Sequence, residues 1–193
     1  MISRKKYLLP VLFLALIVVS GCRSNGAPTY HISEDIDFSF YKKVAVMPLD
    51  NLTNEKYAGD IVRQVVVSEI LASGLLDVVV PGEVMNAVNE LGIKTITSLN
   101  AADIKSLGNA LGVEAIIMGS VEEYGMVKAG SATAPQVTVF LMMADTGTGS
   151  IVWSITKSRG GANFMARHFG ASHETISETV LMLVREAIQT LAY

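Results

Sequence analysis

The chain has 193 residues, a formal net charge of −3 and a hydrophobic fraction of 50%. Its length allows one domain with a core of its own, and its acidic balance argues against a nucleic-acid partner, because phosphate binding needs a basic surface. Cys22 is the single cysteine, which excludes a disulfide within the chain and a metal site built from cysteines.

The first 22 residues have the pattern of a bacterial lipoprotein signal. Basic residues at 4–6 precede an apolar run at 8–19, and small residues then lead to the cysteine. This order is typical of a secretory signal peptide, and the run is shorter than the roughly 20 apolar residues of a membrane-spanning helix. A cysteine placed in this way resembles the lipobox, in which its thiol carries diacylglycerol. We therefore expect removal of residues 1–21 and lipidation of Cys22, with the lipobox formed by Val19, Ser20 and Gly21.

The residues after Cys22 predict the location of the protein. Arg23 and Ser24 follow, and neither is the aspartate that favours retention in the inner membrane of Gram-negative bacteria. The outer membrane is therefore expected, on its periplasmic face, and exposure on the cell surface is left open. Residues 22–40 show little periodicity and predict a flexible tether, with the folded domain over 41–193.

Alternating apolar patterns and turn residues predict the elements of this domain. Gly74 and Gly92 end the first two helices, Pro81 begins the second, and Asn100 with Asp103 forms a capping box for the third. Strands are expected at 42–49, 77–80, 113–124, 136–144 and 151–155; helices at 57–72, 81–91, 100–111 and 175–188; a Gly/Ser/Ala-rich loop at 125–135; and an irregular segment at 158–170.

The order β-α-β-α-α-β-β-β-α predicts an α/β (α+β-like) single domain with a mixed sheet of about five strands and helices packed on it. The strand at 136–144 has two apolar faces, and Phe140 and Met142 lie on the second. That second face is either a surface for assembly or a surface covered by the terminal helix. We expect the helix to cover it.

Three segments in order, at 43–53, 111–121 and 145–153, resemble the CsgG-like and LpoB-like periplasmic lipoprotein domains. The resemblance spans about residues 41–191, and a group of small surface-associated lipoproteins of Gram-negative bacteria shares the pattern. In CsgG, two inserted hairpins form a membrane barrel. Their places correspond here to 128–135, too short for a membrane strand of about 9–11 residues, and to 158–172, which is polar. The resemblance thus implies an assembling domain without a pore of its own.

No set of residues predicts catalysis or a cofactor. His168 and His173 are five apart, not the four that a helical metal site needs, and His31 lies in the tether, so no metal is expected. Asp50 follows the first strand, where ligands bind in open α/β sheets, but a turn explains it as well. Glu122 and Glu123 are neighbours on a strand and are expected on opposite faces.

These observations predict an outer-membrane-anchored lipoprotein that is not an enzyme and acts as an assembly, secretion-accessory or scaffold component of the envelope. Its expected partners are the membrane, through the lipid, envelope proteins and copies of itself. Nucleic acid is not expected, since residues 22–193 hold 12 basic and 18 acidic residues, a net charge of −6. One alternative is an LpoB-like activator of a peptidoglycan synthase, although the tether of about 16 residues reaches at most about 55 Å. The other is a nucleotide or small-ligand-binding module.

Overall fold

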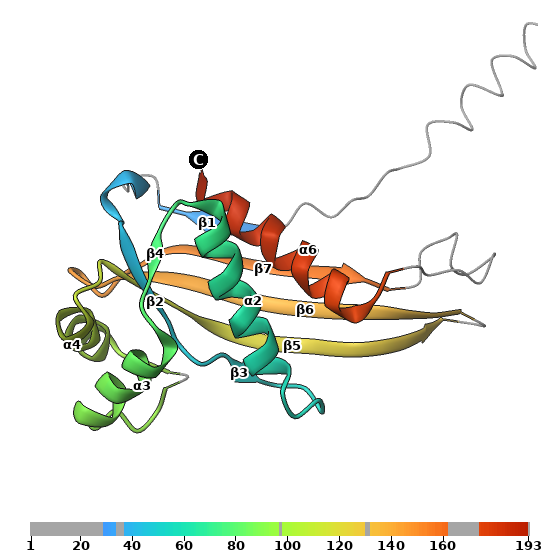
Figure 1. The fold of residues 1–193 in the computed structure, drawn as a ribbon, viewed down its shortest axis with the longest axis horizontal. Helices are drawn as coiled ribbons and strands as arrows, with labels where there is room; N and C mark the ends of the chain where they lie inside the picture. Colours follow the sequence, from blue (N-terminus) through green and yellow to red (C-terminus); the bar gives the residue numbers. More distant parts are fainter. Residues whose placement is uncertain (1–28, 34–36, 97, 130–131, 162–173, 193) are drawn as a thin grey trace, which may run out of the picture.

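The computed structural model describes residues 29–33, 37–96, 98–129, 132–161 and 174–192 (Figure 1). Its strands are β1 (Thr29–Ile32), β2 (Lys43–Val46), β3 (Asp50–Asn51), β4 (Asp77–Val78), β5 (Ala115–Ala129), β6 (Ala132–Asp145) and β7 (Ile151–Gly160). Its helices are α2 (Ala58–Ser73), α3 (Pro81–Glu90), α4 (Ala101–Leu111) and α6 (Ile176–Ile188), with short 3-10 turns η2 (Phe38–Phe40) and η3 (Gln189–Ala192).

The strands form one mixed sheet in the order β1-β7-β6-β5-β2-β4, with β3 also beside β5. β2 pairs in parallel with β4 and β5, whereas β5, β6, β7 and β1 pair antiparallel. The predicted class, a single domain with a mixed sheet and packed helices, is therefore confirmed. The described residues form seven strands, against the expected five or so, because β1 and β3 were not foreseen.

The helix ends agree with the local signals in the sequence. Asn100 accepts hydrogen bonds from the backbone of Ala102 and Asp103, which completes the predicted capping box of α4. Thr175 and Glu178 form a second capping box at the start of α6. Gly74 ends α2 in the left-handed conformation, with a φ of 67°, which a residue without Cβ adopts at little cost.

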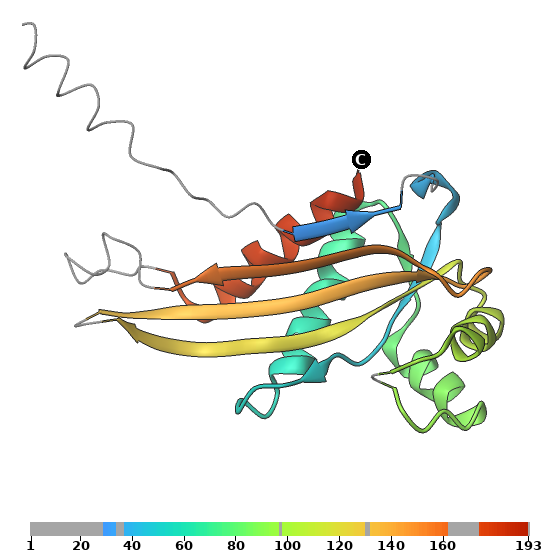
Figure 2. The same cartoon turned by 180° about the vertical axis from the view of Figure 1, so that it is seen from behind.

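Helices α2 and α6 lie side by side across one face of the sheet (Figure 1). Arg185 on α6 joins them by a salt bridge to Glu69 on α2, with Nε 2.9 Å from Oε2. Glu186 anchors α6 to the sheet through Lys157 and Arg159 of β7. On the other face, α3 and α4 cover one end only, and Figure 2 shows the remaining strands uncovered from that side.

The terminal helix covers the face of β6 opposite to the expected one. Val139, Leu141 and Met143 are fully buried in the same cluster as Leu183 and Val184 of α6. Side chains alternate along a strand, so Phe140 points away from α6. The expectation that α6 covers the face with Phe140 and Met142 is therefore wrong. Met142 packs beside the smaller cluster under α3 and α4, and Phe140 stays partly exposed.

Two stretches predicted to be irregular are paired strands. β5 continues to Ala129 and β6 begins at Ala132, so the loop expected at 125–135 is wrong. The reason is that pairing with a partner strand, rather than intrinsic propensity, decides strand formation for Gly, Ser and Ala. β7 likewise runs to Gly160, into the segment expected to be irregular. In the expected tether, residues 29–32 form β1, which pairs with β7 from Thr29 opposite Thr156 to Ile32 opposite Trp153.

We expect Leu183→Ala to lower the free energy of unfolding by about 2–5 kcal/mol, because Leu183 is fully buried between α6 and the sheet. Its neighbour Met182 is 42% exposed, so Met182→Ala should change that free energy by no more than about 0.5 kcal/mol. Urea denaturation of both variants measures the difference. Equal losses in the two variants would contradict the described packing of α6.

Candidate functional site

The tip of the β5–β6 hairpin projects beyond its covering elements (Figures 1 and 2). We call residues 122–129 and 132–138 the hairpin arm. On the edge of β5 away from β6, pairing with β3 ends at Asn51 opposite Val121. From Glu122 to Ala129, β5 therefore has β6 on one side and no described strand on the other. Every second residue of this stretch directs its N–H and C=O outward, as on any free sheet edge.

A bulge marks the start of the hairpin arm. The β5–β6 register shifts between Val121 and Glu123, so Glu122 is an extra residue without a partner on β6. Strict alternation fails at such a point. The expectation that Glu122 and Glu123 lie on opposite faces rested on that alternation, and it does not apply here. The register instead places Glu123 opposite Thr138.

Polar side chains link three strands on the uncovered face of the hairpin arm. Glu123 on β5 accepts hydrogen bonds from Gln136 Nε2 and Thr138 Oγ1 of β6, both at 2.6 Å. Thr138 Oγ1 also lies 2.7 Å from Ser158 Oγ on β7. The hydrogen bonds from Thr138 and Gln136 lower the pKa of Glu123. The base of the arm is thus cross-linked across three strands.

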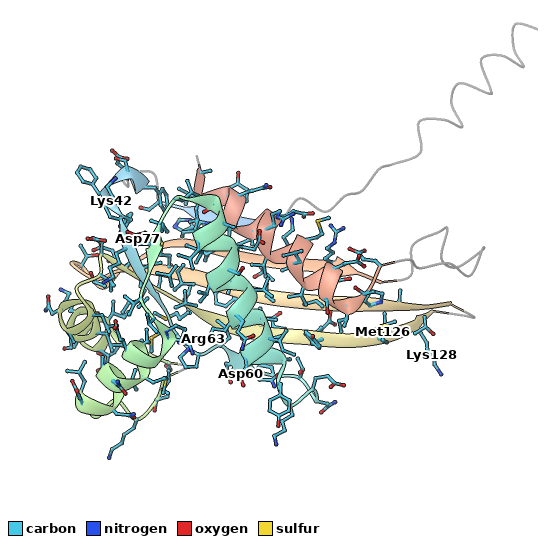
Figure 3. All side chains as sticks on the ribbon, viewed as in Figure 1. Lys42, Asp60, Arg63, Asp77, Met126 and Lys128 are labelled. Carbon is cyan, nitrogen blue, oxygen red and sulfur yellow. The ribbon has the colours of Figure 1, made fainter. Side chains whose placement is uncertain are left out.

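Two side chains stand out near the tip of the arm. Tyr124, Met126 and Lys128 follow one another on the side that faces the helices, and Tyr124 still packs beside the main core. Met126 lies beyond that core and is 57% exposed. Lys128 is exposed as well, and Figure 3 shows both side chains at the end of the arm. The tip therefore presents an apolar side chain and a positive charge to solvent.

A groove runs along the solvent side of α2. We call it the α2 groove; its volume is about 520 Å³, and it is lined by Tyr57, Asp60, Ile61, Arg63, Gln64, Val67 and Pro81. Arg63 donates to the carbonyl oxygen of Val46 from Nε at 3.1 Å and from Nη2 at 2.6 Å. Burial lowers the pKa of Arg63, and the Asp60 carboxylate acts in the opposite direction. The guanidinium remains charged at any physiological pH.

A second hollow, of about 300 Å³, lies where η2 meets the end of the chain, lined by Phe38, Tyr41, Leu76 and Leu191 among others. At its base Tyr41 donates to Asp145 Oδ2 at 3.2 Å. Burial and the neighbouring Asp145 raise the pKa of Tyr41 to about 12, so the phenol stays protonated at neutral pH. The hydrogen bond between Tyr41 and Asp145 holds the start of β2 against the β6–β7 turn. Its role is therefore structural.

The residues proposed from sequence fall into two groups. Val19, Ser20, Gly21, Cys22, His168 and His173 lie outside the described residues, so lipidation stays a prediction. Asp50 forms part of β3, opposite Ser120. Asn51 closes the following turn, because its side chain accepts hydrogen bonds from Thr53 and donates one to the carbonyl oxygen of Glu55. A turn of this kind explains the polar residues around Asn51 without a ligand.

Within the described ranges, no three or more His, Cys, Asp or Glu side chains are grouped so that they could hold a metal ion. No helix in that part of the chain has the length and apolar character needed to cross a bilayer.

Sequence reasoning missed the hairpin arm and the α2 groove. A weak signal for the arm was present: aromatic, apolar and charged residues alternate with small ones from Tyr124 to Lys128. The glycines and alanines around them concealed it. For the groove, Tyr57 and Ile61 lie one turn apart on the side of α2 away from the core, where a helix packed on one face usually carries polar residues.

No family model matches the chain, and no curated protein matches it at a significant level. Among solved structures, a single-residue variant of the PelC dodecamer from Paraburkholderia phytofirmans is similar, with a TM-score of 0.59 and 20% identity over 86% of this chain and 98% of that chain. Lipoprotein GNA1162 from Neisseria meningitidis has a TM-score of 0.56 and 17% identity over 78% of this chain and 98% of its own. The chain thus shares the fold of these two proteins.

The C-terminal domain of LpoB from Salmonella enterica also matches, with a TM-score of 0.47 and 16% identity over 61% of this chain and 81% of that domain. The expected likeness to LpoB is therefore found as a partial structural match, whereas the likeness to CsgG stays a prediction.

We expect Thr138→Val to make stability less dependent on acid pH. The folded pKa of Glu123 is lowered by Thr138, so its carboxylate contributes stability at neutral pH that is lost as the pH falls through the folded pKa. The free energy of unfolding should therefore fall less steeply between about pH 5 and pH 3 in this variant than in the parent. Urea denaturation at a series of pH values measures it. Thr156→Val, an exposed change on β7, is the control and should keep the parental slope.

Proposed function

We propose that this chain is an outer-membrane lipoprotein, lipidated on Cys22, whose non-enzymatic domain assembles with copies of itself in the cell envelope. The observation that carries the proposal is the hairpin arm. It is a projecting hairpin with a free β5 edge along residues 122–129 and one face outside the cover of the described helices. Proteins usually protect or cover such an edge, and here no described strand pairs with it.

The structural neighbours support this proposal without deciding it. PelC, which shares the fold, was solved as a dodecamer, and GNA1162 is described as a lipoprotein. The identities of 20% and 17% carry the fold only, so assembly and anchoring remain proposals for this chain. Its own residues argue in the same direction, because the described part holds an unpaired sheet edge on β5.

The position of β1 limits where such an assembly can form. Only residues 23–28 lie between Cys22 and Thr29, the first residue of the sheet. Six residues span at most about 20 Å when fully extended, less than half the reach expected for a longer tether. An anchor on Cys22 would hold β1 close to the membrane surface. This short reach favours neighbouring copies or partners at the same membrane over a distant enzyme.

Anchoring would also promote assembly by itself. Lipidated copies share one leaflet and diffuse in two dimensions, so their effective concentration for one another is raised. Three acyl chains anchor far more strongly than one, which keeps the copies in place while they associate. A modest contact between domains is then sufficient for an ordered array or ring. Such an assembly is suited to a scaffold or secretion-accessory role.

We expect the full-length lipoprotein, purified in detergent, to have a mass by light scattering of several copies. Replacing residues 128–133 by Asn-Gly should shorten the arm and remove Lys128 while Val127 stays opposite Ala134, since Asn-Gly favours a two-residue hairpin turn. That variant should be monomeric and retain the parental circular dichroism and thermal unfolding. A monomeric parent at high protein concentration would overturn the proposal.

We expect the mature protein to begin at Cys22 and to carry diacylglycerol and an N-acyl chain, because its lipobox places a cysteine directly after small residues. Mass spectrometry of the N-terminal peptide measures this. Cys22→Ser should abolish the lipid mass and the processing, whereas Ser24→Ala, outside the lipobox, should leave both unchanged. An unmodified N-terminus at another residue in the parent would contradict the predicted anchor.

A further inference from the structure

The solvent side of α2 is more apolar than its place in the fold requires. Tyr57 is 59% exposed and Ile61 is 40% exposed, and Val80, which precedes the groove-lining Pro81, is 61% exposed. Single exposed apolar residues are common, but here they gather around the α2 groove, whose walls include Val67 and Pro81. A concave apolar surface of this kind is typical of a docking site.

The α2 groove carries two charges, Asp60 and Arg63, and neither forms a salt bridge in the described part of the chain. Arg63 is held by the carbonyl of Val46, and Lys56 stands over the Tyr57 ring, 5.0 Å from its centroid. Asp60 is exposed and forms none of the salt bridges of the described residues. The groove therefore offers apolar walls and an available carboxylate at its rim.

The tip of the hairpin arm has complementary chemistry. Met126 is a long, flexible apolar side chain of the kind that fills irregular hollows, and Lys128 carries a positive charge. They lie two residues apart on one face of β5, so their Cα atoms are about 7 Å apart. The groove follows α2 from Tyr57 to Val67, ten residues or about 15 Å of helix. Both side chains of the tip can therefore enter it together.

The tip and the groove of one chain cannot meet. Figure 3 shows Met126 and Lys128 at the free end of the arm, and Asp60 and Arg63 on α2, well separated from it. The arm is a paired hairpin tied across three strands by Glu123, Thr138 and Ser158, so it cannot fold back onto α2. A contact between the two surfaces must join two molecules.

We infer that the arm tip of one copy docks in the α2 groove of the next, with Met126 between the apolar walls and Lys128 against Asp60. The inference rests on the proposed self-assembly and names its interface. It joins two different surfaces, so each copy both gives an arm and receives one. Such head-to-tail contacts form a ring when the rotation that relates one copy to the next brings the last copy back to the first. They form a filament when it does not. A common anchor in one leaflet requires the rotation axis to be perpendicular to the membrane, which favours a ring.

Charge exchange across the interface tests the pairing. Lys128→Glu and Asp60→Lys should each weaken association of the full-length lipoprotein in detergent about five- to tenfold, because each places like charges together. The double variant should regain the parental association to within about twofold. Lys105→Glu, an exposed change on α4 away from both surfaces, is the matched control and should have no effect. Sedimentation at several concentrations measures association, and thermal unfolding should be unchanged throughout.

Cysteine pairing gives an independent measurement. Cys22 is the only native cysteine, so two engineered thiols can be followed without interference once a parent control shows no disulfide. Mixed copies carrying Met126→Cys and Gln64→Cys should form a disulfide dimer in membranes. Copies carrying Met182→Cys, which is similarly exposed but on α6, should not pair with Gln64→Cys.

The results separate this inference from the proposed function. If the parent assembles, the charge variants associate normally and no disulfide forms, the groove contact is overturned and self-assembly stands. If the parent is a monomer, both fail. Recovery in the double charge variant together with the specific disulfide would establish the contact.

Discussion

The antiparallel pairing of β5 with β6 organises the rest of the molecule. It runs from Ala115 opposite Asp145 to Ala129 opposite Ala132, and it adjoins the parallel pairing of β5 with β2. The two strands approach closely at Gly119, where any side chain would collide with the carbonyl oxygen of Phe140. The register set by this pairing decides which side chains face the helices and which remain on the open side.

That register produces an unequal cover of the sheet. The odd-numbered residues of β6 from Val137 to Met143 lie under α6, whereas the even-numbered ones face the other side. There α3 and α4 protect only one end, near Met118 and Ala144. The remainder is stabilised by polar bonds such as Glu123 with Thr138, which tolerate water. The protein thereby combines a core that excludes water with a hairpin arm that stays folded while it is exposed to solvent.

Only six residues separate the proposed lipid anchor on Cys22 from the first strand of the sheet. Because β1 pairs with β7, the chain is fixed to the domain from Thr29 onward. A lipid on Cys22 would thus restrain the position of the whole sheet near the membrane. With the anchor at one edge strand and the hairpin arm on another part of the same sheet, copies in one leaflet would meet in a restricted range of orientations. Restricted orientation lowers the entropic cost of association.

Local signals were enough to predict the helices and the class of the fold. Caps at Asn100, Thr175 and Gly74, and the proline that begins α3, involve groups within a few residues of one another, so the sequence alone determines them. The pattern of a lipoprotein signal before Cys22 is equally local, and it predicts the proposed cellular location without reference to the fold. The apolar alternation at 136–144 likewise showed that both faces of this strand carry apolar residues.

The tertiary structure decided everything that depends on a distant partner. Residues 125–129 and 132–135 are rich in Gly and Ala, which have weak strand propensity, and they become strands because they pair with each other. Residues 29–32 become a strand because β7 offers an edge with which they pair. The side of β6 under α6, the free edge beyond Asn51 and the separation of the arm tip from the α2 groove follow from the same long-range pairing. The sequence by itself determined the helices and the class of the fold, and it carries the pattern from which the location is proposed. Only strand pairing between remote segments decided which surfaces were left open, because hydrogen bonding across a sheet is not encoded in neighbouring residues.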